Sequence, residues 1–218
     1  MSTDPAPDHA AVATRVGCAP IADALDRRFG HRAHLHDLVA PTTGLVLSGR
    51  AVTMRFLPLR RDRVDDRRDF GALLAHASGD RSLADHVLVA AADDPEQAVA
   101  GGKKLSRLRN LGMGGLLTDG RVRDLAEAAE MGLAVWCRGE AVRNANEVLM
   151  AWELEVPVSV GGTAVFPGDW VHADASGAVV IPGEHVGEIL EDAVAIVERD
   201  AAQVERMRSD DALRTTGG

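Results

Sequence analysis

The sequence predicts a single-domain α/β fold with a mixed sheet. In the early part of the chain, apolar runs typical of buried strands alternate with helical patterns. In the late part, short strands separated by turns that contain Gly and Pro indicate hairpins. The chain has 218 residues with 46% hydrophobic content, which is enough to bury one full core, and no composition shift suggests a second domain.

Strands and helices follow one another through the first half. Residues 1–15 are rich in Ala, Pro and Asp and are predicted to form a loose tail. The segment 60–69 mixes both charge signs so densely that we expect it on the surface. Gly101 and Gly102 are unfavourable inside a helix, so a turn is expected there. The expected elements are helices at 21–29, at 70–77 and from Lys103 to Leu111, and strands at 49–56 and 86–92.

The second half contains the hairpins. Gly161-Gly162 lies at the centre of a predicted hairpin over 157–165, and turns are expected at 166–169 and 176–177. After Pro182-Gly183, apolar residues recur with helical spacing. The expected elements are strands at 114–118, 133–137, 170–173 and 178–181, and helices that start near 125 and 186.

The segment 114–124, Gly-Gly-Leu-Leu-Thr-Asp-Gly-Arg-Val-Arg-Asp, is the most informative for function. An apolar strand ends at Asp-Gly, and Arg123 and Asp124 then lie at or near a helix N-terminus. Free N–H groups in a first helical turn attract anions, and a carboxylate there can hold a divalent cation. A simpler interpretation is that Asp124 complements the helix dipole and Arg123 forms a surface ion pair.

The segment resembles the signature of the RraA-like family, which includes the regulator of ribonuclease activity A and the class II 4-hydroxy-4-methyl-2-oxoglutarate aldolases. Further motifs agree in the same order over about residues 16–200. They are Ile21-Ala22-Asp23-Ala24-Leu25-Asp26, Gly49-Arg50-Ala51-Val52-Thr53, His86-Val87-Leu88-Val89, Gly101-Gly102, Val165-Phe166-Pro167-Gly168-Asp169 and Ala173-Asp174-Ala175-Ser176-Gly177. The resemblance places the domain at 16–200, with a helix end and tail at 201–218.

The resemblance implies a compact β/β/α sandwich of the swivelling-domain type, assembled as a homotrimer or a hexamer. It also implies a metal-dependent lyase that acts on a 2-oxo acid, of the aldolase or oxaloacetate decarboxylase type. Asp124 would then hold Mg²⁺ or Mn²⁺, and Arg123 would contact the keto oxygen and the developing enolate. Gly101, Gly102 and Lys103 would lie at the substrate, where backbone amides hold pyruvate.

The chain departs from the aldolase pattern at Gly102. The family places a carboxylate there, about twenty residues before the arginine, to anchor metal-bound water. Asp93 or Asp94 would replace it if their loop folds back. A carboxylate of a neighbouring subunit, such as Glu188, Glu191 or Asp192, would also complete the site.

Two basic residues leave alternatives open. Lys103 either holds a substrate carboxylate or points to water. Arg121 adds charge where the family more often has a small residue. It either selects a more anionic substrate or pairs with Glu127 or Asp119.

Bulk properties exclude some functions. The formal net charge of −9 argues against a nucleic-acid-binding surface, which needs an excess of Lys and Arg. No apolar stretch is long enough to cross a membrane, no signal peptide is visible, and a cytoplasmic location is expected. Cys18 and Cys137 lie in no zinc-type spacing, and Cys137 is expected to be a buried strand residue.

The sequence therefore leaves two main classes of function open. The first is the lyase, with a small 2-oxo acid as its partner. The second is a non-catalytic protein that binds and inhibits a ribonuclease, as some members of the family do. The missing carboxylate at Gly102 favours the second class, whereas Arg123 and Asp124 together favour the first. A third possibility, a biosynthetic enzyme with an altered pocket and a larger substrate, would use Arg121 and Lys103.

Overall fold

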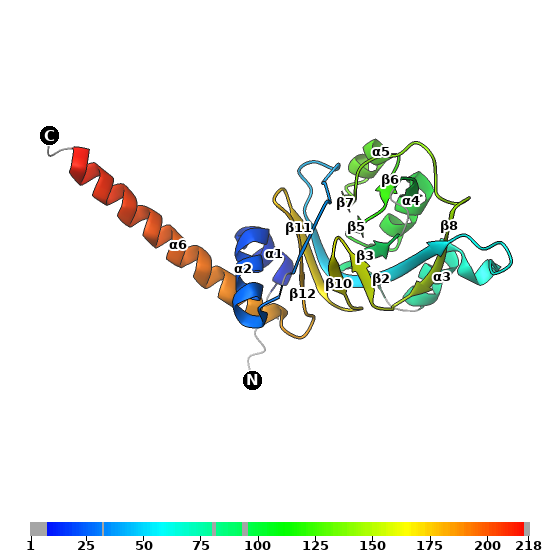
Figure 1. Ribbon diagram of the computed structural model, residues 1–218, viewed down its shortest axis with the longest axis horizontal. Coiled ribbons are helices and arrows are strands. Elements are labelled where there is room, and N and C mark those ends of the chain that lie inside the picture. The colour runs from blue at the N-terminus through cyan, green and yellow to red at the C-terminus, as the bar shows by residue number, and fades with distance from the viewer. Residues whose placement is uncertain (1–7, 32, 80–81, 93–95, 216–218) are drawn as a thin grey trace.

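An eight-stranded mixed sheet forms the centre of the molecule (Figure 1). The computed structural model describes residues 8–31, 33–79, 82–92 and 96–215. The strands lie in the order β1-β12-β11-β2-β3-β5-β7, and β8 also pairs with β2. Strands β2, β3, β5 and β7 run parallel, whereas β1, β12, β11 and β8 join by antiparallel pairs. Their bounds are β1 His34–Leu35, β2 Leu47–Pro58, β3 His86–Ala91, β5 Gly115–Thr118, β7 Ala134–Trp136, β8 Leu149–Leu154, β11 Trp170–Asp174 and β12 Gly177–Ile181.

Helices and two small strand pairs surround this sheet. The hairpin of β9 and β10 is antiparallel, and β4 and β6 pair in parallel. The bounds are α1 His9–Val16, α2 Cys18–Phe29, the 3-10 turn η1 Asp66–Arg68, α3 Phe70–Ser78, β4 Ala98–Ala100, α4 Gly102–Asn110, β6 Arg121–Val122, α5 Leu125–Glu130, β9 Val158–Val160, β10 Thr163–Val165 and α6 Val186–Thr215.

The molecule has three layers, because the sheet packs against a separate core on each of its two faces. Val52 and Met54 of β2 belong to the core that contains residues of α3, α4 and α5. Ala51, which comes directly before Val52, belongs to the core that contains Val160 of the β9–β10 hairpin. Successive residues of a strand point to opposite faces, so the helices cover one face and the hairpin the other. The predicted α/β fold, a β/β/α sandwich with a mixed sheet, is confirmed.

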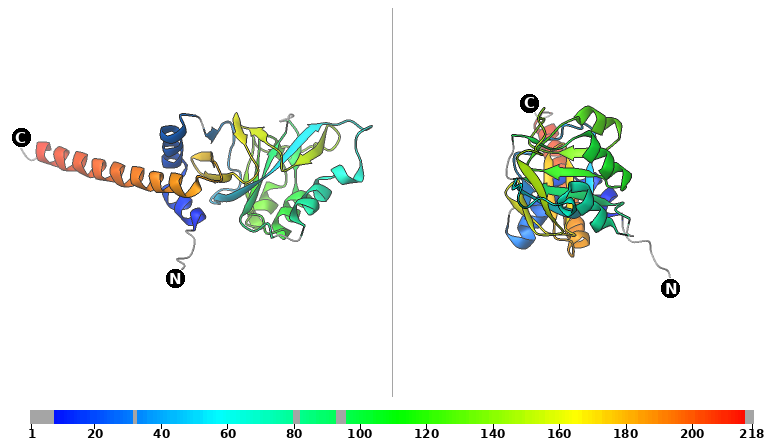
Figure 2. Two further views of the ribbon diagram at one scale, coloured as in Figure 1. Left: turned by 90° about the horizontal axis from the view of Figure 1, so that it is seen from below. Right: turned by 90° about the vertical axis from the view of Figure 1, so that its right-hand side faces the viewer.

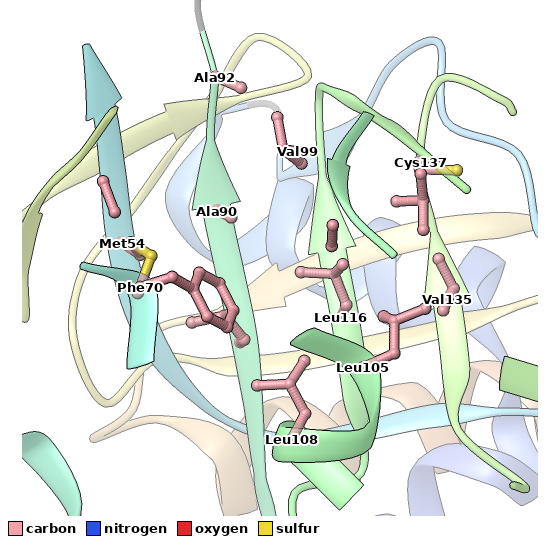
Figure 3. Packing of buried hydrophobic residues seen from close by; sticks show 14 of the residues in the cluster. Met54, Phe70, Ala90, Ala92, Val99, Leu105, Leu108, Leu116, Val135 and Cys137 are labelled. Atoms are coloured by element: carbon pink, nitrogen blue, oxygen red, sulfur yellow. The ribbon is translucent and has the colours of Figure 1, made fainter. Parts of the chain in front are cut away.

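Helix α4 is fixed by its apolar side. Leu105 and Leu108, three residues apart, lie on one face of the helix and are both 0% exposed. They belong to the same core as Leu116 of β5 and Val135 of β7 (Figure 3). This packing leaves the polar side and the first turn of α4 free for other contacts.

A third core lies under α1, α2 and α6. It joins Ile21 of α2, Ile189 of α6 and Val179 of β12. Helix α1 corrects the prediction of a loose tail for residues 9–15, because Asp8 accepts a hydrogen bond from Ala11 N at 3.1 Å and Ala13 is buried. The apolar residues of α1 are few, and they stabilise the helix only because they pack against this core. Residues 1–7 of the expected tail lie outside the described residues.

Helix α6 extends well beyond the sheet. Its first turns bury Ile189, Leu190 and Ala193, whereas Val204 and Met207 are 46% and 55% exposed. Figure 1 and Figure 2 show the outer part of the helix leading away from the body to the C-terminus. No helix within the described residues combines the length and the apolar content that a membrane span requires.

Candidate functional site

A cavity of about 970 Å³ lies where α4 and α5 begin. Its lining includes the predicted residues Gly101, Gly102, Lys103, Arg123 and Asp124. Four basic side chains contribute to it, from Lys103, Lys104, Arg107 and Arg123. Three acidic side chains contribute as well, from Asp69, Asp124 and Glu127. The cavity is therefore suited to an anionic ligand with a cation beside it.

Asp124 links the two helices that border the cavity. It precedes α5 with a left-handed backbone (φ 60°, ψ 38°), which Asp tolerates better than most residues. Its carboxylate does not cap α5. Instead, Oδ2 accepts a hydrogen bond from Gly102 N at 2.8 Å and lies 3.6 Å from Arg123 Nε. Asp124 therefore holds the start of α4 and the guanidinium of Arg123 together, which is more than the dipole role that the simpler interpretation gave it.

Gly101 is the residue that lets these groups meet. A Cβ atom at Gly101 would lie 2.7 Å from Arg123 Cγ and 2.8 Å from Asp124 Oδ2. Both separations are shorter than a van der Waals contact, so only glycine leaves Arg123 and Asp124 in place.

Glu127 occupies the space beside Gly102. A Cβ atom at Gly102 would lie 2.6 Å from Glu127 Oε2 and 3.4 Å from Asp124 Oδ2. The carboxylates of Asp124 and Glu127 thus both lie beside Gly102, the position at which the aldolase pattern has a carboxylate of its own. The sequence reasoning considered Glu127 only as a partner of Arg121. The signal that could have identified it is its position in the first turn of α5, three residues after Asp124.

Lys104, rather than Lys103, is the lysine held inside the site. Its Nζ donates to the Val99 carbonyl at 2.7 Å and lies 5.0 Å from the centre of the Phe70 ring. Burial lowers the pKa of Lys104 to about 8, Asp69 opposes this change, and Arg123 adds to it. Lys103 lines the cavity but is exposed. The helical spacing from Leu108, four residues later, could have placed Lys104 on the inner side.

Arg121 and the alternative carboxylates were also candidates for this site. The Arg121 guanidinium donates to the Glu140 carbonyl at 3.3 Å, and Arg121 is not among the residues that line the cavity. Its placement does not support the predicted substrate contact. Asp93 and Asp94 lie outside the described residues. On α6, Glu188 and Asp192 both form ion pairs with Arg28.

A named protein is similar to this chain in sequence. The chain is 30% identical over 132 residues to a protein of Halalkalibacterium halodurans named "Putative 4-hydroxy-4-methyl-2-oxoglutarate aldolase". The match covers 61% of this chain and 62% of that protein, so the chain spans less than two thirds of this relative's length.

Solved structures extend the similarity to nearly the whole chain. Streptomyces coelicolor RraAS2, described as an unusual member of the RNase ES inhibitor RraA protein family, superposes with a TM-score of 0.78 at 28% identity. That match covers 94% of this chain and 100% of RraAS2. An uncharacterized protein of Pseudomonas syringae has the same fold, with a TM-score of 0.79 at 22% identity, and the match covers 95% of this chain and 91% of that one. The model of the RraA-like family, described as Aldolase/RraA, matches residues 18–180, and the chain belongs to this family.

Proposed function

We propose that the cavity at Arg123 and Asp124 is the active site of a metal-dependent lyase that cleaves a carbon–carbon bond of a 2-oxo acid. The observation that carries the proposal is the convergence of Arg123, Asp124 and the start of α4 on one open cavity. The proposed substrates are 4-hydroxy-4-methyl-2-oxoglutarate and oxaloacetate, which each carry two carboxylates. The basic side chains around the cavity favour such anions.

The donor set around Gly102 fits a hard cation such as Mg²⁺ or Mn²⁺. Carboxylate oxygens are the ligands that these ions prefer, and Asp124 and Glu127 both present one beside Gly102. Asp124 would bind the ion, and Glu127 would hold its water in place of the carboxylate that Gly102 lacks. When bound, the cation supplies positive charge to the oxygen atom that becomes negative as the bond breaks.

The chain's own residues would orient the substrate. Arg123 carries a permanent charge on a rigid fork of donors, which suits the keto oxygen and its neighbouring carboxylate. Asp124 keeps that fork in position through their 3.6 Å contact. Lys104 and Lys103 would attract the distal carboxylate, because Lys104 Nζ is held close to the cavity wall and Lys103 reaches it from solvent.

An oxaloacetate decarboxylation assay tests the proposal. The purified chain should release pyruvate with Mg²⁺ or Mn²⁺, and a chelator should abolish the rate. Arg123→Lys should lose at least about tenfold, because one donor to developing charge contributes roughly 10²–10³ in rate. Asp124→Asn should lose at least about tenfold as well, because the ion loses an anionic ligand. Arg121→Lys is the matched control and should retain the rate, since Arg121 lies off the cavity. Equal rates in wild type and Arg123→Lys would remove Arg123 from the mechanism.

The second candidate is a protein that inhibits a ribonuclease. The absence of a side chain at Gly102 favours it, together with the near-complete structural match to RraAS2. No metal-dependent turnover of oxaloacetate, combined with no pyruvate binding by calorimetry, would favour this candidate. Turnover that is lost in Asp124→Asn would show that inhibition of a ribonuclease is not the only function of the chain.

Assembly would complete the catalytic site in the proposed enzyme. We infer a homotrimer or a hexamer, in which Glu188, Glu191 or Asp192 on α6 of one copy approaches the cavity of the next. Sedimentation equilibrium gives the assembly, and a monomer at assay concentrations would contradict this inference.

A further inference from the structure

A second group of side chains that could bind a metal ion lies outside the cavity, between α2 and β11. Cys18, His172 and Asp174 each offer one ligand atom, and these atoms all lie within 4.8 Å of one another. Cys18 is 5% exposed, the His172 side chain is 0% exposed, and the Asp174 side chain is 21% exposed. The group is therefore buried except at Asp174, which leaves one route from solvent.

The local fold explains why these residues meet. His172 and Asp174 are two residues apart on β11, so both point to the face of the sheet that α1, α2 and α6 cover. Cys18 is the first residue of α2, and its N–H donates to Asp174 Oδ2 at 2.9 Å. The start of α2 is thereby held against the strand.

His172 is the member of the group whose bonding is incomplete. Its Nδ1 lies 2.7 Å from Ser48 Oγ on the adjacent strand β2. Its Nε2 has no hydrogen-bond partner and lies 4.0 Å from Asp174 Oδ2, beyond hydrogen-bond reach. When Nδ1 donates to Ser48, Nε2 carries a lone pair that points toward Asp174 and Cys18. A histidine that binds a metal has this arrangement, with its other nitrogen bonded to an orienting group.

We propose that Cys18, His172 and Asp174 form a binding site for Zn²⁺, with water as the fourth ligand. Zn²⁺ accepts sulfur, nitrogen and oxygen ligands together, whereas Mg²⁺ takes oxygen ligands. The thiolate and the carboxylate balance the charge of the ion, and the thiol proton passes to solvent on binding. Ligand atoms around tetrahedral Zn²⁺ lie roughly 3.4–3.8 Å apart. The ligand atoms therefore need to approach one another by at most about 1.4 Å, and the ion would then fasten α2 to β11.

Cobalt binding tests the site without any enzymatic assay. Co²⁺ occupies zinc sites, and a Cys ligand gives a sulfur-to-cobalt charge-transfer band in the near ultraviolet. We expect one equivalent of Co²⁺ to produce this band in the full chain and Zn²⁺ to remove it by competition. Cys18→Ser should lose the band, and His172→Gln should weaken Co²⁺ binding by at least about tenfold. Circular dichroism of both variants checks that they are folded.

Two matched variants separate this site from others. Cys137→Ser removes the second buried cysteine and should keep the band. Asp124→Asn alters the proposed lyase site and should keep it as well, so failure of one proposal leaves the other intact. Absence of the band in wild type would overturn the zinc site. An undiminished band in Cys18→Ser, or unchanged affinity in folded His172→Gln, would also overturn it.

Discussion

Gly101 lies where Arg123 and Asp124 leave no space for a side chain. Gly101→Ala should displace both side chains, lower the free energy of unfolding by about 1–3 kcal/mol and reduce oxaloacetate turnover by at least about tenfold. Gly114→Ala is the matched control, because the nearest atoms to its added Cβ lie at 3.7 Å. Urea denaturation and the decarboxylation assay measure the two effects. Equal turnover in the two variants would contradict the tight fit at Gly101.

Lys104 should make stability depend on pH. Its folded-state pKa, about 8, lies below the ordinary value of 10.5. The cost of burying the charge is therefore fully present below about pH 8 and is relieved as the pH rises toward 10.5. The stability of wild type relative to Lys104→Met should increase over this window by up to about 3 kcal/mol.

Urea denaturation of both proteins at pH 7 and pH 10 measures this change. Lys103→Met is the matched control for removing a positive charge from an exposed position of α4. If the difference between wild type and Lys104→Met stays constant across the window, the Lys104 ammonium is not desolvated as described.

Glu127 and Gly102 should control the affinity for Mn²⁺. Glu127→Gln removes one of the two carboxylates beside Gly102 and should weaken Mn²⁺ binding about tenfold, while Gly102→Asp should strengthen it, because hard cations bind more tightly to more anionic ligands. Glu130→Gln, on the same helix but off the cavity, is the control. Electron paramagnetic resonance of free Mn²⁺ gives the affinities. Unchanged binding in Glu127→Gln would show that Glu127 does not replace the missing group.

At the scale of single residues, sequence reasoning found the part of the site that lies in one motif. It placed Arg123 and Asp124 together at the start of a helix, and the structure has them there. Helical spacing from Leu108 favours Lys104 over Lys103 as the inward lysine, but only the structure shows that Phe70 of α3 covers it. Sequence reasoning could not find the neighbours of Cys18, since His172 is 154 residues away in the chain.

Helix α6 should stabilise the fold through its first turns only. Ile189 is 0% exposed in the core with α2, whereas Val204 is 46% exposed. Ile189→Ala should lower the free energy of unfolding by about 2–4 kcal/mol, and Val204→Ala should change it by less than about 0.5 kcal/mol. Urea denaturation of the two variants makes the comparison. A large loss for Val204→Ala would mean that the outer part of α6 is buried in an assembly.

At the scale of elements, strong local patterns predicted most of the sheet. The apolar runs at 86–92 and 133–137 became β3 and β7, and Gly161-Gly162 forms the β9–β10 turn. Strand β8 was not predicted, because residues 149–154 show no clear alternation and the strand forms by pairing with the end of β2. Helix α1 was missed for a similar reason, since its apolar side is defined only by contact with the third core.

For the molecule as a whole, the net charge of −9 predicts weak affinity for nucleic acids. A labelled single-stranded RNA should bind with a Kd weaker than roughly 100 µM at physiological salt, which is weaker than the non-specific binding of nucleic-acid-binding proteins. Fluorescence anisotropy measures this value. Arg121→Glu is the control, because it removes a partly exposed arginine outside the cavity. Micromolar binding lost in Arg121→Glu would reveal a local basic surface.

The surroundings of Gly102 have a consequence for how members of this family diverge. The group nearest to an added Cβ is the flexible end of Glu127, not backbone, so an aspartate can enter with little disturbance of the fold. Two glycine codons differ from an aspartate codon by a single nucleotide. A lineage can therefore lose or regain the carboxylate in one mutational step, while Gly101, Arg123 and Asp124 keep the rest of the arrangement ready.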